Sequence, residues 1–97
     1  MSLTRTTFRY TRQFDIEPFN DSSAAYVFCN EPPSVLILDS LSWLTLELCN
    51  DTDFDTVESC FLEASKGIIE KVEAREVLEQ IIEDLQGRDL VAAEETN

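Results

Sequence analysis

The spacing of apolar residues changes at Leu38, and this change limits the possible folds more than any other feature of the chain. Residues 7–16 alternate with the period of a half-buried strand, their apolar side chains being Phe8, Tyr10, Phe14 and Ile16. Residues 24–29 and 34–38 are rich in β-forming side chains, and the Asn-Glu-Pro-Pro sequence between them favours a turn. We therefore predict three strands, the last two of which form a hairpin.

Helical spacing follows Leu38. Residues 41–49 fit either a strand or a helix, but a helix is favoured because Asp39 or Ser40 can cap it. A second helix is predicted to begin with a capping box, in which Asp55 is the N-cap residue and Glu58 its partner. A third is predicted from one apolar stripe that ends near Gly87. The residues of this stripe are Ala74, Val77, Leu78, Ile81, Ile82 and Leu85.

Together these elements predict an α+β fold, in which a three-stranded antiparallel N-terminal sheet is followed by three helices in a winged-helix-like arrangement. At 97 residues the chain is expected to form one domain. We place that domain at residues 1–91 and expect residues 92–97 to be a frayed tail.

The chain is strongly acidic, with a formal net charge of −13. Such a charge repels nucleic acid phosphates and anionic lipids, so neither nucleic acid nor a membrane is expected as a partner. The acids either attract a basic partner or only keep the domain in solution, and both interpretations stay open. The sequence has no apolar run long enough to span a membrane and no signal-peptide pattern at its start, which predicts a cytoplasmic protein.

Side chains that commonly carry chemistry are scarce. The chain contains no histidine, two glycines and three cysteines, and the cysteines lack metal-ligand spacing. We expect the cysteines Cys29, Cys49 and Cys60 to be buried as small hydrophobic residues. The sequence therefore predicts a protein with no cofactor and no metal.

The triplet Asp39-Ser40-Leu41 resembles the phosphopantetheine attachment site of acyl carrier proteins. It supports an alternative function, an acyl or peptidyl carrier with the cofactor on Ser40. A carrier needs a long amphipathic helix before this triplet, whereas the residues before it are strand-like.

A series of short motifs along most of the chain resembles the PqqD-like family, also called RiPP recognition elements, which are chaperones of ribosomally made, post-translationally modified peptides. The resemblance is carried by the order and spacing of Leu38-Asp39, Leu48-Cys49-Asn50, Thr56-Val57, Glu76-Val77, Leu85 and Asp89-Leu90-Val91. No single one of these motifs is diagnostic.

The resemblance implies non-catalytic binding of the leader region of a precursor peptide. The leader would add a strand in a groove between the third strand and the last helix, and be presented to a separate maturation enzyme, such as a radical SAM protein, a cyclodehydratase or a leader protease. The candidate peptide-binding residues are Ser34, Val35, Leu36, Ile37 and Leu38 on the strand, and Glu73, Glu76, Val77, Gln80, Ile81 and Asp84 on the helix. Two alternatives stay open: residues 34–38 form a central strand buried on both faces, and the helix acids are only a solvated face.

Overall fold

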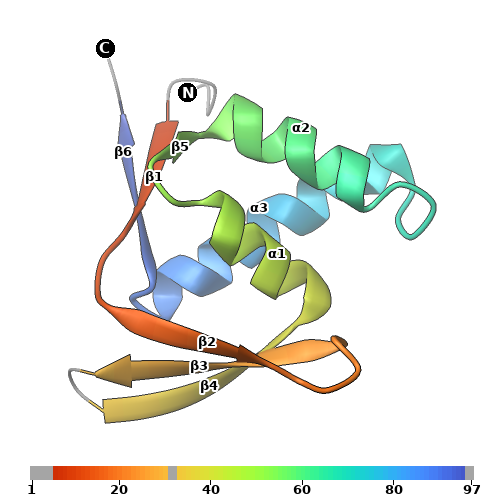
Figure 1. The fold of residues 1–97 in the computed structure, drawn as a ribbon. Coiled ribbons are helices and arrows are strands. Elements are labelled where there is room, and N and C mark those ends of the chain that lie inside the picture. The colour runs from red at the N-terminus through yellow and green to blue at the C-terminus, as the bar shows by residue number, and fades with distance from the viewer. Residues whose placement is uncertain (1–5, 31–32, 96–97) are drawn as a thin grey trace.

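The computed structural model describes residues 6–30 and 33–95, and over these residues the chain has an α+β fold with two three-stranded antiparallel sheets and three helices (Figure 1). The elements are β1 (Thr6–Tyr10), β2 (Phe14–Pro18), β3 (Ala24–Asn30), β4 (Pro33–Asp39), α1 (Ser40–Leu48), β5 (Thr52–Asp53), α2 (Phe54–Ala64), α3 (Lys71–Gly87) and β6 (Val91–Glu95). The α+β class predicted from the sequence is confirmed.

The two sheets divide what was expected to be one strand. Residues 7–16 form β1 and β2, and these belong to different sheets, ordered β5-β1-β6 and β2-β3-β4. The chain leaves the first sheet at Thr11, whose backbone N–H donates to the Leu90 carbonyl and whose hydroxyl donates to the Asp89 carbonyl. Thr11 is thus held by the residues that follow α3 at the point where the chain leaves the first sheet, and no local sequence pattern indicates these contacts.

Strands also occur after the first helix, so the expected order of all strands before all helices is wrong. The short β5 lies between α1 and α2, and β6 follows α3. β6 pairs with β1 from Tyr10↔Val91 to Thr6↔Glu95, so the frayed tail expected from residue 92 is not found over residues 92–95. Residues 96 and 97 lie outside the described part of the chain. Strand formation by Ala92–Glu95 depends on this pairing rather than on β-propensity.

The starts of α1 and α2 follow side-chain capping. Of the two predicted caps of α1, Asp39 and Ser40, the structure uses Asp39, since its Oδ1 accepts a hydrogen bond of 2.8 Å from the backbone N–H of Ser42. The prediction for α2 is wrong by two residues, because the N-cap is Asp53, which accepts from the N–H of Thr56 at 2.8 Å, and not Asp55. The earlier start places Phe54 inside the first turn, where it is fully buried with its ring 6.3 Å from that of Phe8.

The helices pack against one another, with α1 on β3 and β4 of one sheet and α2 and α3 against the strands of the other, and all share one core (Figure 1). The apolar stripe of α3 faces this core, where Ala74, Leu78, Ile82 and Leu85 are buried and Val77 and Ile81 are half-buried. Among the cysteines, Cys29 and Cys49 are buried as expected, whereas Cys60 is exposed. No helix within the described residues is long and apolar enough to cross a membrane.

Candidate functional site: the free edge of β4

β4 is an edge strand. One side of it pairs with β3 in a continuous antiparallel register from Ala24↔Asp39 to Asn30↔Pro33, and no other described strand pairs with it. Every second residue of an antiparallel strand directs its N–H and C=O away from a given neighbour. β4 therefore carries a row of backbone donors and acceptors that no described strand satisfies. The alternative of a central strand buried on both faces is wrong, because Val35 and Ile37 are 58% and 57% exposed.

The five candidate residues of β4 divide between the two faces of the sheet. Leu36 lies opposite Val27 and is half-buried, and Leu38 lies opposite Ala25 and is buried, so these two fix the strand to the core. Val35 and Ile37 point to the other face. The feature of β4 that is available to a peptide is thus its backbone edge, with side chains above and below it.

The two edges of this sheet differ in their protection. β2, at the opposite edge, carries Asp15, Glu17 and Pro18, whereas residues 34–38 of β4 contain neither charge nor proline. Charged side chains and proline are the usual means by which proteins protect an edge from further pairing. Residues 34–38 of β4 therefore lack the protection that β2 carries at the opposite edge.

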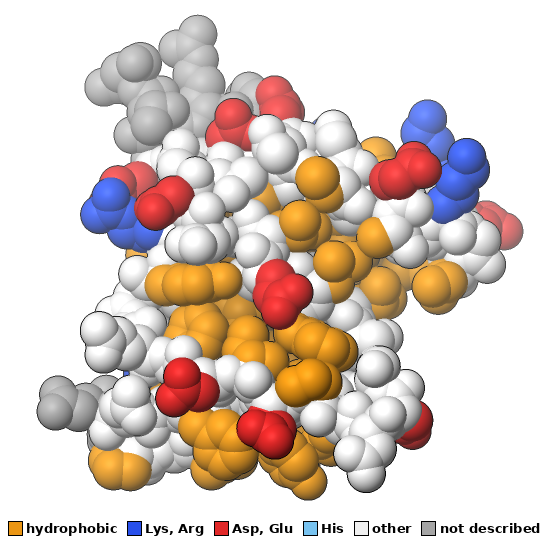
Figure 2. Space-filling view, in the orientation of Figure 1, with side chains coloured by type: hydrophobic (Ala, Val, Ile, Leu, Met, Phe, Trp, Pro, Cys, Tyr) orange, Lys and Arg blue, Asp and Glu red, His pale blue; other side chains and the backbone are white. Residues whose placement is uncertain are grey.

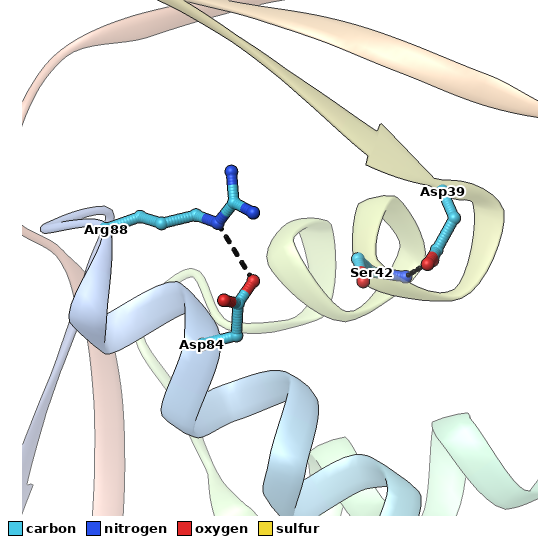
Figure 3. A network of polar contacts seen from close by, with 4 residues as sticks. All are labelled: Asp39, Ser42, Asp84 and Arg88. Carbon is cyan, nitrogen blue, oxygen red and sulfur yellow. Dashed lines mark hydrogen bonds and ion pairs between the residues drawn. The ribbon is translucent and has the colours of Figure 1, made fainter.

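α1 follows β4 directly in the chain and packs against both β4 and α3. Figure 3 shows Asp84 in the last turn of α3 and Arg88 just after the helix, across from the start of α1, where β4 ends at Asp39. A shallow hollow on this end of α3 is lined by Gln80, Glu83, Asp84, Gly87 and Arg88. Two of the predicted helix residues, Gln80 and Asp84, are therefore brought together in one surface depression.

The candidate residues of α3 fall into an apolar and a polar group. Val77 and Ile81 are half-buried against the core, whereas Glu73, Glu76, Gln80 and Asp84 are exposed. The Asp84 carboxylate is already paired, because Arg88 Nε lies 2.9 Å from its Oδ2 (Figure 3). Glu73 and Glu76 form no ion pair with a described residue, so their charge is available to a partner.

Arg88 was missed by the sequence analysis. It is a cation in the hollow at the end of α3, and its side chain lies against Asp84. The available signal was the spacing of an acid and a base four residues apart, which brings both to one helix face. A peptide that reaches this end of α3 would meet a base as well as acids.

Ser40 is the first residue of α1 and is exposed. The element before it is β4, not the long helix that precedes the modified serine of a carrier protein. The side-chain cap of α1 is Asp39 and not Ser40.

Within the described residues no group of three or more histidine, cysteine or acidic side chains is placed to hold a metal ion. Comparisons with protein-family models, with curated proteins and with solved structures found no match to this chain. Its function is therefore inferred from its own residues and geometry.

Proposed function

We propose that this chain is a non-catalytic peptide-binding domain of the PqqD-like kind, with a winged-helix-like arrangement of β2–β4 and the three helices. In this proposal it binds the leader region of a ribosomal precursor peptide, which adds a strand to the free edge of β4. The observation that carries the proposal is that edge: β4 has no described partner strand on that side, and its residues 34–38 lack the charge and proline found on β2.

Binding would combine two kinds of contact. The leader backbone exchanges hydrogen bonds with the outward N–H and C=O groups of β4, which supplies affinity irrespective of sequence. Specificity comes from side chains of the leader that reach α3, where Val77 and Ile81 offer apolar contact and Glu73, Glu76, Gln80 and Asp84 offer polar contact. We expect a dissociation constant in the micromolar range or below, equivalent to about −8 kcal/mol.

The bound leader would hold the rest of the precursor near a separate maturation enzyme, of which a radical SAM protein, a cyclodehydratase and a leader protease are the candidates. Holding a substrate in this way raises its effective concentration at the enzyme without a catalytic group in this chain.

The test is a titration with synthetic leader peptides encoded by short open reading frames next to the gene for this chain. Backbone amide shifts of the ¹⁵N-labelled protein are expected to change over residues 34–38 and 73–84. Changes confined to residues 14–18 would place the peptide on the protected edge and contradict the proposal.

A second measurement tests strand addition itself. Two versions of the binding leader carry backbone N-methyl groups on its odd or on its even residues, which removes alternate N–H donors. Because an added strand directs only every second N–H to its neighbour, one version is expected to lose binding and the other to retain much of it. Equal affinity of both versions would rule out pairing with β4.

A further inference from the structure

The face of the β2–β3–β4 sheet that points away from the core is apolar on one half and acidic on the other. Its cross-strand rows are Asp15–Phe28–Val35 and Glu17–Tyr26–Ile37. The apolar residues thus lie on β3 and β4, and the acids lie side by side on β2. We call the four residues Tyr26, Phe28, Val35 and Ile37 the outer patch.

The side chains of the outer patch are more exposed than side chains of a hydrophobic core. Tyr26 is 38% and Phe28 39% exposed, and Val35 and Ile37 are more than half exposed. The Phe19 ring extends the row of aromatic rings, with its centroid 4.7 Å from that of Tyr26, which in turn lies 6.0 Å from Phe28. In Figure 2 hydrophobic and acidic side chains appear together at the lower edge of the molecule, where Figure 1 places β2–β4. Contiguous exposed apolar residues of this kind mark interaction surfaces.

A second copy of this chain does not fit the outer patch. Sheet-to-sheet packing of two copies would bring together two chains of net charge −13, each with Asp15 and Glu17 on the contacting face.

An amphipathic helix fits both the dimensions and the charge of this face. Neighbouring strands lie about 4.8 Å apart and a helix with its side chains is about 10 Å wide, so one helix running along the strands covers β3 and β4. Its flank then lies over β2, where Asp15 and Glu17 would face it. The other margin, along β4, carries no charge between Ser34 and Leu38.

We propose that the outer patch docks an amphipathic helix of a partner protein, with a continuous apolar stripe and lysine or arginine along one flank. This site lies on a face of the sheet, whereas the free edge of β4 lies in the plane of the sheet. The two sites are adjacent and distinct, and the inference holds whether or not β4 accepts a peptide strand.

The experiment uses two synthetic 18-residue helical peptides that share one leucine stripe and differ only in one flank, which is lysine in the first and glutamate in the second. Each is titrated into the ¹⁵N-labelled full chain. The lysine peptide is expected to shift amides of β2, β3 and β4 and to bind at least tenfold more tightly than the glutamate peptide. Equal binding of the two peptides, or no binding of either, would overturn the proposal.

Variants locate the contact. The double variant Phe28→Thr/Ile37→Thr keeps β-forming residues on the strands and is expected to lose at least tenfold in affinity for the lysine peptide. The matched control, Ile68→Thr/Val72→Ala, removes two strongly exposed apolar side chains elsewhere and is expected to bind as the wild type does. An unchanged affinity after the Phe28/Ile37 change would show that the outer patch is not the contact. Amide spectra of both variants establish that the fold is intact.

Charge variants test the flank. Asp15→Asn/Glu17→Gln is expected to remove most of the difference between the two peptides, whereas Asp55→Asn/Glu63→Gln, on the exposed side of α2, is expected to preserve it. If the difference in affinity between the two peptides persists in the Asp15→Asn/Glu17→Gln variant, it arises from the overall charge of the chain. The proposed placement of the basic flank over β2 would then be wrong. Sedimentation of the wild type provides a last check, since a dimer that is lost in the Phe28→Thr/Ile37→Thr variant would make a second copy the occupant instead.

Discussion

The Cys49 thiol is expected to make the stability of this fold decrease at alkaline pH. Cys49 is fully buried at the end of α1, and burial raises its pKa from 9.0 to about 12. In the unfolded chain the thiol loses its proton near pH 9, whereas in the folded chain it keeps the proton until about pH 12. The free energy of unfolding is therefore unaffected below pH 9 and falls as pH rises from 9 towards 12.

The size of this effect follows from the difference between the two pKa values. One pKa unit corresponds to about 1.4 kcal/mol. At pH 10.5, roughly 1.5 units above the pKa of the unfolded thiol, the folded state is therefore expected to lose about 2 kcal/mol. Tyr10 contributes in the same direction, because burial raises its pKa and the nearby Cys49 and Glu47 add to the rise.

Urea unfolding followed by circular dichroism, at pH 8 and pH 10.5 in the presence of a reductant, measures the effect. The loss between the two pH values is expected to be about 2 kcal/mol smaller in Cys49→Ala than in the wild type. Cys60→Ala is the matched control, because it removes an exposed thiol and leaves the buried Cys49 in place. If Cys49→Ala and the wild type lose the same free energy, Cys49 ionises at its ordinary pKa and the packing at the end of α1 is not as described.

Three further outcomes are expected. Asp53→Ala should lower the midpoint of thermal unfolding, because the hydrogen bond that the Thr56 N–H donates to Asp53 caps α2, whereas Asp55→Ala should leave the midpoint nearly unchanged. The reverse result would support the capping box that the sequence predicted at Asp55. Incubation with a promiscuous phosphopantetheinyl transferase and coenzyme A should leave the intact mass unchanged, and added mass on Ser40 would establish the carrier alternative. Glu73→Gln/Glu76→Gln should reduce the salt dependence of the association rate of a basic leader, since surface charge mainly affects association; stopped-flow traces with the same salt response as the wild type would show that these acids only solvate α3.

The helices were predictable because the signals that define them are local. The stripe of α3 recurs every three or four residues, and Asp39 caps α1 from within its own segment. The strands were harder to predict. Apolar side chains fall on even positions on both sides of the break at Thr11, so the alternation in the sequence continues although the sheet does not. The rings of Tyr10 and Phe14 even pack together across the break, with their centroids 4.7 Å apart. β5 and β6 form only because β1 pairs with both, and that pairing joins segments distant in sequence.

The position of the candidate site in the fold was predictable in part for the same reason. The absence of charge and proline from residues 34–38 indicated an unprotected strand. Whether that strand lies at the edge of the sheet depends on the whole fold and could not be predicted. The outer patch was not foreseen, because β3 is apolar at every position from Ala24 to Cys29 and alternation cannot say which face is buried. The fold buries the small face, Ala25, Val27 and Cys29, and exposes the aromatic one. Small side chains on the inner face allow α1 to pack closely against β3, and the large rings are left to the outside.

The acidic composition acquires a specific role when it is considered together with the open strand. An edge without charge or proline promotes pairing between copies of the same chain. Nothing in residues 34–38 opposes such pairing, but two copies of this chain each carry a net charge of −13, and they repel one another before their edges can meet. A neutral or basic peptide experiences no such repulsion. The overall charge can thus protect β4 against self-association while leaving it accessible to a different chain, so solubility and partner selection need not be separate explanations of the twenty acids.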